Sequence, residues 1–247
     1  MPTIFELLNT TQRGGFGPSI EILCNAICPR SCPCCNQQSF MAAYPDYEYT
    51  LDDARQFLRA LSENGIKVGV VFSGGEPSRW SFLWEVLSLF GSSPNISSIR
   101  VTTSDDDPTY IIRLKTMTDK IYFSHRPDHH WSRHNPPAYM GGVNIWSAEN
   151  HVVWPTERWN GPTVCCCRNV GIIASVMGQG VYPCVVSLNM KERGHWDDLE
   201  PVSLSDYFSG KVSIPPIGTY EACRFCVNND VYRSSNPPTY STEKKAK

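Results

Sequence analysis

Between residues 19 and 125, short apolar runs alternate with longer amphipathic runs. The apolar runs predict strands, and the amphipathic runs predict helices. The strands are expected at 19–25, 66–77, 97–104 and 119–125, and the helices at 50–65, 79–91 and 108–117. This order is typical of a parallel α/β sheet, either open or partly closed as a barrel.

Helix-capping residues support this reading of the first half. Thr50 suits an N-cap, Asp52 and Asp53 suit the first turn, and Gly65 suits the position just after the helix ends. Asp107 followed by a proline is a typical start for the helix at 108–117.

The pattern weakens after residue 126. Two further strands are expected in the runs GGVNIW and NHVVW, and a hairpin is expected from 171–177 and 180–187, which flank a glycine-rich turn. We therefore expect a domain boundary near residue 160.

Composition excludes several functional classes. The net charge is −2 and charged residues make up 19% of the chain, which argues against a large nucleic-acid footprint. No apolar run approaches the roughly 18 residues of a membrane span. The N-terminal residues have no signal-peptide pattern. The sequence therefore predicts a cytoplasmic protein with no membrane contact.

The 11 cysteines are strongly clustered. Positions 36–164 contain none, and the cysteines fall in three groups, at 24–35, 165–184 and 223–226. A reducing cytoplasm disfavours structural disulfides, so clusters of this kind usually bind metal or carry out redox chemistry.

The first group contains the spacing Cys-x3-Cys-x2-Cys at Cys28, Cys32 and Cys35. Three thiolates on one loop suit three irons of a [4Fe–4S] cluster and leave the fourth iron open, whereas structural zinc sites usually close with four protein ligands. The alternatives are a zinc knuckle or spare buried thiols, and Cys34 competes with Cys35 as the third ligand.

The cysteine loop follows the first predicted strand, and the second predicted strand ends in SGGEP at 73–77. This pairing resembles the radical S-adenosylmethionine (SAM) superfamily. The resemblance implies a partial TIM barrel and a cluster whose open iron binds the amino and carboxylate groups of SAM. One electron from that cluster would cleave SAM to methionine and a 5′-deoxyadenosyl radical.

The same resemblance implies a set of SAM-binding residues at the ends of the strands. Glycines at 74 and 75 would allow close approach of the backbone to SAM, the glutamate would organise a polar network, and the proline would fix the turn. A Thr-Ser-Asp turn at 103–105 replaces the Ser/Thr-Asn-Gly turn of the family, and Cys34 replaces its usual aromatic residue. The implied SAM-binding set is Gly74, Gly75, Glu76, Pro77, Thr103, Ser104 and Ser124.

The later cysteines can form a second four-ligand site. Cys184, Cys223 and Cys226 are clear candidates, and one thiol of the triplet 165–167 would complete the site, with Cys167 the best by spacing. This part resembles the Twitch domain, a short form of the SPASM extension, in which a hairpin and a C-terminal CxxC hold one auxiliary [4Fe–4S] cluster. A zinc ribbon is the alternative.

With this extension, the layout is similar to the 2-deoxy-scyllo-inosamine dehydrogenase type over residues 18–230. We expect a partial barrel at 1–160, a Twitch domain of β-hairpin plus helix at 161–232 and a tail at 233–247. The substrate would be a small alcohol, a peptide or a nucleotide, with His125 and Arg158 as candidate contacts. Flavodoxin or ferredoxin would supply the electron. The alternative is a non-catalytic iron–sulfur or zinc-binding protein.

Overall fold

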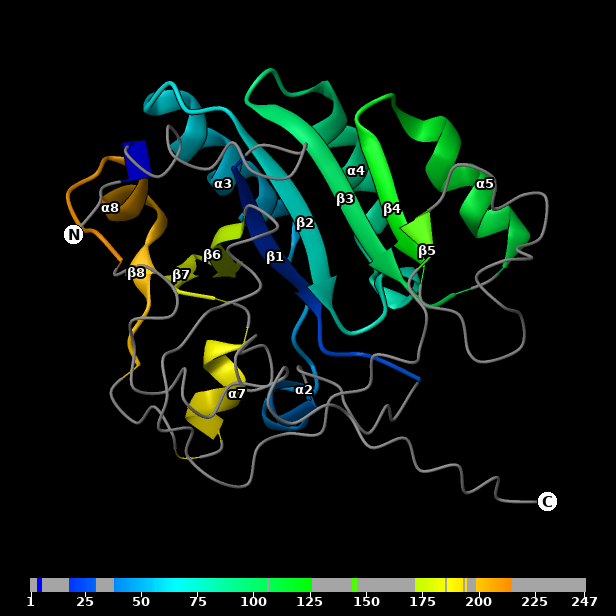
Figure 1. Cartoon of the computed structure of the whole chain (residues 1–247), viewed down its shortest axis with the longest axis horizontal. Coiled ribbons are helices and arrows are strands. Elements are labelled where there is room, and N and C mark those ends of the chain that lie inside the picture. The colour runs from blue at the N-terminus through cyan, green and yellow to red at the C-terminus, as the bar shows by residue number, and fades with distance from the viewer. Residues whose placement is uncertain are drawn as a thin grey trace, which may run out of the picture.

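The computed structural model of the chain describes residues 4–5, 18–29, 38–105, 107–125, 144–145, 172–184, 186–192, 194 and 199–214. Within these residues the strands form one sheet in the order β5-β4-β3-β2-β1-β6-β7-β8 (Figure 1). The strands are β1 (Ser19–Asn25), β2 (Val68–Gly74), β3 (Ile96–Thr103), β4 (Ile121–His125), β5 (Asn144–Ile145), β6 (Ile172–Met177), β7 (Gly180–Tyr182) and β8 (Val202–Ser203).

The pairing of these strands agrees with the predicted parallel sheet. Strand β1 pairs in parallel with β2 on one side and with β6 on the other, and β2, β3, β4 and β5 continue in parallel. The predicted hairpin is present, because β6 and β7 are antiparallel, and β8 adds a further antiparallel strand. The hairpin thus extends the same sheet next to β1.

The helices are α2 (Gln38–Ala43), α3 (Leu51–Glu63), the 3-10 turn η1 (Pro77–Arg79), α4 (Leu83–Ser92), α5 (Pro108–Met117), α7 (Ser187–Glu192) and α8 (Leu204–Phe208). Helices α3, α4 and α5 cover one face of the sheet, while α2 and α7 lie beyond the carboxyl ends of β1 and β2 (Figure 1). No helix among the described residues combines the length and apolar character needed to span a bilayer.

The predicted caps form. The Thr50 side chain accepts a bond from the Asp53 N–H at 3.1 Å, and the Asp53 carboxylate accepts from the Thr50 N–H at 2.9 Å, which completes a capping box. Asp107 accepts from the Thr109 N–H at 2.8 Å, and Gly65 has a positive φ of 62°. These local bonds set the first residues of α3 and α5.

The helix predicted at 79–91 begins later, at Leu83. Trp80 ends η1 with an extended backbone, and its indole N–H donates to the Tyr49 carbonyl at 2.7 Å. This long-range bond holds Trp80 in the core and separates the 3-10 turn from α4. The strand predicted at 180–187 also ends early, because β7 stops at Tyr182 before Pro183, which has no N–H to donate.

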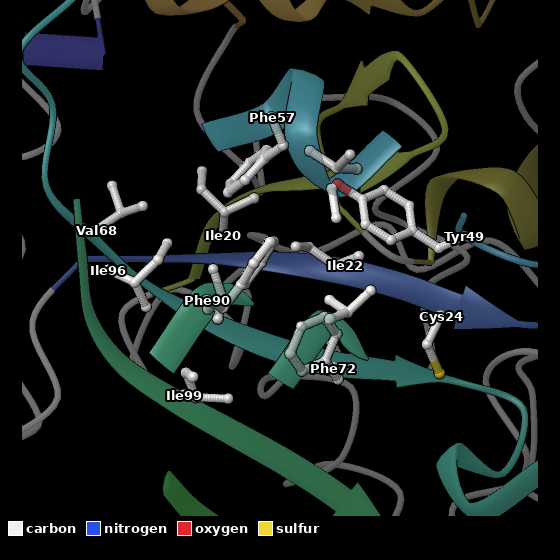
Figure 2. Packing of buried hydrophobic residues seen from close by; sticks show 14 of the residues in the cluster. Ile20, Ile22, Cys24, Tyr49, Phe57, Val68, Phe72, Phe90, Ile96 and Ile99 are labelled. Carbon is white, nitrogen blue, oxygen red and sulfur yellow. The ribbon is translucent and has the colours of Figure 1, made fainter. Parts of the chain in front are cut away.

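The main core lies between the sheet and helices α3–α5. Figure 2 shows Ile20 and Ile22 of β1 and Phe72 of β2 facing Phe57 of α3 and Phe90 of α4. The Phe57 and Phe90 rings stack with centroids 5.7 Å apart. Successive strand residues point to opposite faces, so Glu21, Leu23, Val71 and Ser73 lie on the other face of the sheet. The predicted strand at 150–154 and the boundary near residue 160 lie outside the described residues.

Candidate functional site

The carboxyl ends of β1, β2 and β3 bring together three stretches that are far apart in the sequence. They are the start of the first cysteine loop, the glycine turn at 74–77 and the Thr-Ser-Asp turn at 103–105. Asn25 of β1 pairs with Gly74 of β2, and β2 pairs in parallel with β3. Parallel strands place their carboxyl ends at one edge, which is where ligands of such sheets bind.

Backbone hydrogen bonds fix the glycine turn on the cysteine loop. The Gly75 N–H donates to the Asn25 carbonyl at 2.7 Å, and the Glu76 N–H donates to the Ile27 carbonyl at 2.8 Å. The Asn25 side-chain amide donates in return to the Glu76 carbonyl at 3.1 Å. Cys28, the first predicted cluster ligand, follows Ile27 directly. The bond from Glu76 to Ile27 therefore holds Cys28 close to the glycine turn.

Both glycines of the turn are required by this close contact. Gly74 has a φ of +116°, and a Cβ there would lie 2.6 Å from the Asn25 carbonyl oxygen. A Cβ at Gly75 would overlap the Asn25 side-chain oxygen and the Ile27 carbonyl. The sequence had indicated a different reason for these glycines, close approach to SAM, and that role stays a prediction.

Glu76 organises the polar network at this edge. Its side chain is 4% exposed. One carboxylate oxygen accepts from the Thr103 hydroxyl at 2.5 Å and from the Ser78 N–H at 3.2 Å, and the other accepts from the Ser104 N–H at 2.8 Å and hydroxyl at 2.6 Å. All four bonds come from the protein itself. Glu76 therefore ties the end of β2 to the end of β3.

Asn25 is a site residue that the sequence analysis missed. It is fully buried, and its side-chain oxygen has no hydrogen-bond partner among the described residues. Its amide group bonds the glycine turn, as described above. Only the register of β1 against β2 shows this role, because nothing in the local sequence separates Asn25 from an ordinary strand-end asparagine.

Cys24 differs from the cysteines of the predicted cluster. Its thiol is fully buried, points to the helix side of β1 and lies among the core residues in Figure 2. Burial raises its pKa strongly, and the nearby Glu76 carboxylate raises it further. The thiol therefore stays protonated near neutral pH, and Cys24 acts as a small core residue.

Cys184 is the described member of the predicted second site. It is buried just after β7, and its carbonyl accepts from both the hydroxyl of Ser187, at 2.6 Å, and the N–H of Ser187, at 3.1 Å. Ser187 begins α7, which contacts α2, the helix that follows the first cysteine loop. The two cysteine-bearing regions thus lie at the same end of the sheet (Figure 1).

The remaining predicted residues are placed only in part. Ser124 and His125 end β4 and pair with Thr102 and Thr103 of β3, so both positions lie at the same edge as Glu76. The other predicted residues lie outside the described part of the chain: Cys32, Cys35, Cys167, Cys223, Cys226 and Arg158. Their predicted roles stay predictions.

Comparison with known proteins agrees with the architecture. No protein-family model and no curated protein matches the sequence. Among solved structures, BtrN in complex with AdoMet and 2-DOIA superposes with a TM-score of 0.56 and 17% identity, covering 86% of this chain and 94% of that chain. BtrN in an open conformation gives a TM-score of 0.52 and 14% identity, covering 88% of each chain.

These likenesses show the fold. The chain has an α/β architecture with a parallel sheet, as the sequence predicted, and it shares the fold of BtrN over most of its length.

Proposed function

We propose that the protein is a radical SAM enzyme. Cys28, Cys32 and Cys35 would hold a [4Fe–4S] cluster, and the adjacent turn would help to seat SAM. The observation that carries this proposal is the direct bonding of the glycine turn to Asn25 and Ile27, immediately before Cys28. Two segments that lie about 50 positions apart in the sequence, 25–27 and 75–76, thus belong to one structural unit.

The cysteine motif and the described residues of this edge support the two cofactors. The three thiolates of the motif would suit a cluster with one open iron. The buried side-chain oxygen of Asn25 has no hydrogen-bond partner among the described residues, lies at the same edge and would accept a hydrogen bond from a donor there. The AdoMet in the BtrN complex, on a fold that this chain shares, further supports SAM as the cofactor.

Bound together, the cluster and SAM would supply a 5′-deoxyadenosyl radical that abstracts a hydrogen atom from the substrate. The chain's own contribution is to hold the glycine turn, the first cysteine and the end of β3 in a fixed relation. Glu76 does this by accepting four protein hydrogen bonds, so we assign it a positioning role. The predicted SAM contacts at Gly74, Gly75, Pro77, Thr103, Ser104 and Ser124 belong to the same proposal.

We further propose that Cys184, Cys223, Cys226 and one thiol of the triplet, Cys167 by spacing, hold an auxiliary [4Fe–4S] cluster. The position of Cys184 at the same end of the sheet as Cys28 supports this arrangement. A cytoplasmic reductant such as flavodoxin or ferredoxin would supply the electron. The alternative function is a non-catalytic iron–sulfur or zinc-binding protein, which would cleave no SAM.

The decisive measurement is 5′-deoxyadenosine formation by anaerobically reconstituted protein with SAM and dithionite. We expect the wild-type protein to form it and Cys28→Ala to lose it. Cys24→Ala is the matched control, because that thiol belongs to the core: it should cost some stability and leave product formation and iron content unchanged. Wild-type protein that binds zinc, or that carries iron but forms no product, would contradict the proposal.

A further inference from the structure

An open groove of about 700 Å³ lies on the outer side of helices α3, α4 and α5, and we call it the three-helix groove. The helices lie side by side on one face of the sheet, with α4 in the middle (Figure 1). The outward positions of α4 include Ser88 and Ser92, which are exposed and line the groove. Because these side chains are short, the middle of the groove stays open to a protruding segment of a partner.

The apolar part of the groove comes from all three helices. Leu51 of α3, Trp84 and Leu89 of α4, and Met117 of α5 line it, and each is half-buried. Their inner sides pack on the main core, so their outer sides remain available at the groove. Half-buried side chains of this kind, tryptophan above all, are typical anchors of protein interfaces.

Two arginines give the groove a positive character. Arg55 of α3 and Arg113 of α5 line it and are exposed, and Glu85 is the acidic member of the described lining. No ion pair within the described part of the chain engages any of these three residues. The guanidinium carbon of Arg113 lies 3.8 Å from the centroid of the Trp84 ring, a cation–π contact that holds this charge at the groove. Both arginines can therefore receive carboxylates from a partner.

The groove also connects with the candidate site. Trp84 lies in the first turn of α4, which follows the glycine turn after η1. Its ring packs edge-on against Tyr110, with centroids 5.8 Å apart. Tyr110 is buried, and its pKa is raised first by burial and next by the nearby Glu76 carboxylate. Two packed rings thus link the groove to the glutamate that ties β2 to β3.

We propose that the three-helix groove docks the reductant, and that the reductant is an acidic electron-transfer protein whose carboxylates meet Arg55 and Arg113. The inference rests on the proposed function, because the cluster of a radical SAM enzyme needs an electron. In each encounter the partner is oxidised by one electron and the cluster is reduced by one electron. Electron-transfer partners associate weakly through small interfaces and are steered by charge, which suits an open groove with two arginines.

Charge favours this partner over two other occupants. The basic end of the chain itself, EKKAK at 243–247, would be repelled by the arginines. A second copy of the chain would bring the groove against itself, so that four arginines would face two copies of Glu85. An acidic protein neutralises both arginines and still covers the apolar lining.

The test measures binding by isothermal titration calorimetry, on the reconstituted full-length protein at low ionic strength. The probes are flavodoxin and ferredoxin, which are acidic, and cytochrome c, a basic electron-transfer protein. We expect an acidic probe to bind, and Arg55→Glu and Arg113→Glu each to weaken it about tenfold, because carboxylates would then face like charges. Arg113→Glu also loses the contact with Trp84, whereas Arg55→Glu tests charge without that loss.

Lys211→Glu is the matched control. It changes the net charge by the same amount, but Lys211 is an exposed residue just after α8, at the opposite edge of the sheet from α5 (Figure 1). Its affinity for the acidic probe should stay within about twofold of wild type, since exposed charges beyond a Debye length are largely screened.

Sedimentation velocity of the same variants tests the second-copy alternative. A wild-type dimer that Arg113→Glu dissociates would assign the groove to self-association and overturn the inference. Equal affinity in all variants, an equally large loss in Lys211→Glu, absence of binding by both acidic probes, or tighter binding of cytochrome c would also overturn it. Failure of the proposed function is distinct, because it appears as absent 5′-deoxyadenosine in wild-type protein reduced by dithionite, which needs no docking.

Discussion

The two faces of this sheet carry different chemistry on the same strands. On β1, Ile20, Ile22 and Cys24 enter the helix-side core, whereas Glu21 faces the opposite side. On β2, Phe72 enters the core, and its neighbour Ser73 presents to the other face a hydroxyl with no hydrogen-bond partner among the described residues. Burial of the apolar helix-side face stabilises the fold. The opposite face can therefore carry polar groups, which tight packing by itself would not favour.

The largest expected difference in the free energy of unfolding is between alanine variants of Phe72 and Ser73. Phe72→Ala removes a ring that lies 5.2 Å from Trp80 and 5.6 Å from Phe90, between centroids, and leaves a cavity. We expect the free energy of unfolding in urea to fall by about 3–5 kcal/mol. Ser73→Ala should change it by less than about 0.5 kcal/mol. Similar losses for the two variants would break the distinction between the faces.

A smaller change in the free energy of unfolding is expected at Glu76, at the carboxyl edge of the sheet where the candidate site lies. Glu76→Gln keeps the shape but replaces a charged acceptor of four hydrogen bonds, one oxygen becoming a donor that faces other donors. Unfolding free energy should fall by about 2–3 kcal/mol, since bonds to charged groups are among the stronger ones.

Glu48→Gln is the control for this variant. Glu48 accepts one exposed bond, from the Ser81 N–H at 2.8 Å, so its loss should cost under about 1 kcal/mol. Equal costs for the two glutamates, in the same urea titration, would show that the network around Glu76 does not hold the turn.

Local signals predicted much of this structure. The succession of apolar and amphipathic runs located β1–β4 and α3–α5. The capping residues Thr50 and Asp107 predicted where two of the helices begin. The resemblance to the radical SAM superfamily also implied that the glycine turn and the first cysteine loop serve one site, and the structure joins the two segments through Asn25 and Ile27.

What escaped prediction depends on long-range contacts. Trp80 interrupts a predicted helix because Tyr49, 31 positions earlier, accepts its indole hydrogen. Glu21 and Arg100 share a row only because both pair with Val71, and no window of sequence contains that register. The site role of Asn25 likewise follows from its pairing with Gly74.

The finest comparison uses two adjacent residues of identical type. Val70 and Val71 are both buried, but Val70 belongs to the helix-side core, whereas Val71 lies between Glu21 and Arg100 on the polar face.

Val→Thr replaces a methyl by a hydroxyl of nearly the same size. At Val70 the new hydroxyl meets apolar side chains, so we expect a loss of about 1–3 kcal/mol in urea unfolding. At Val71 it can bond to its charged neighbours, and the loss should stay below about 0.5 kcal/mol. Equal losses at the two positions would mean that the second face is packed as tightly and as apolar as the first.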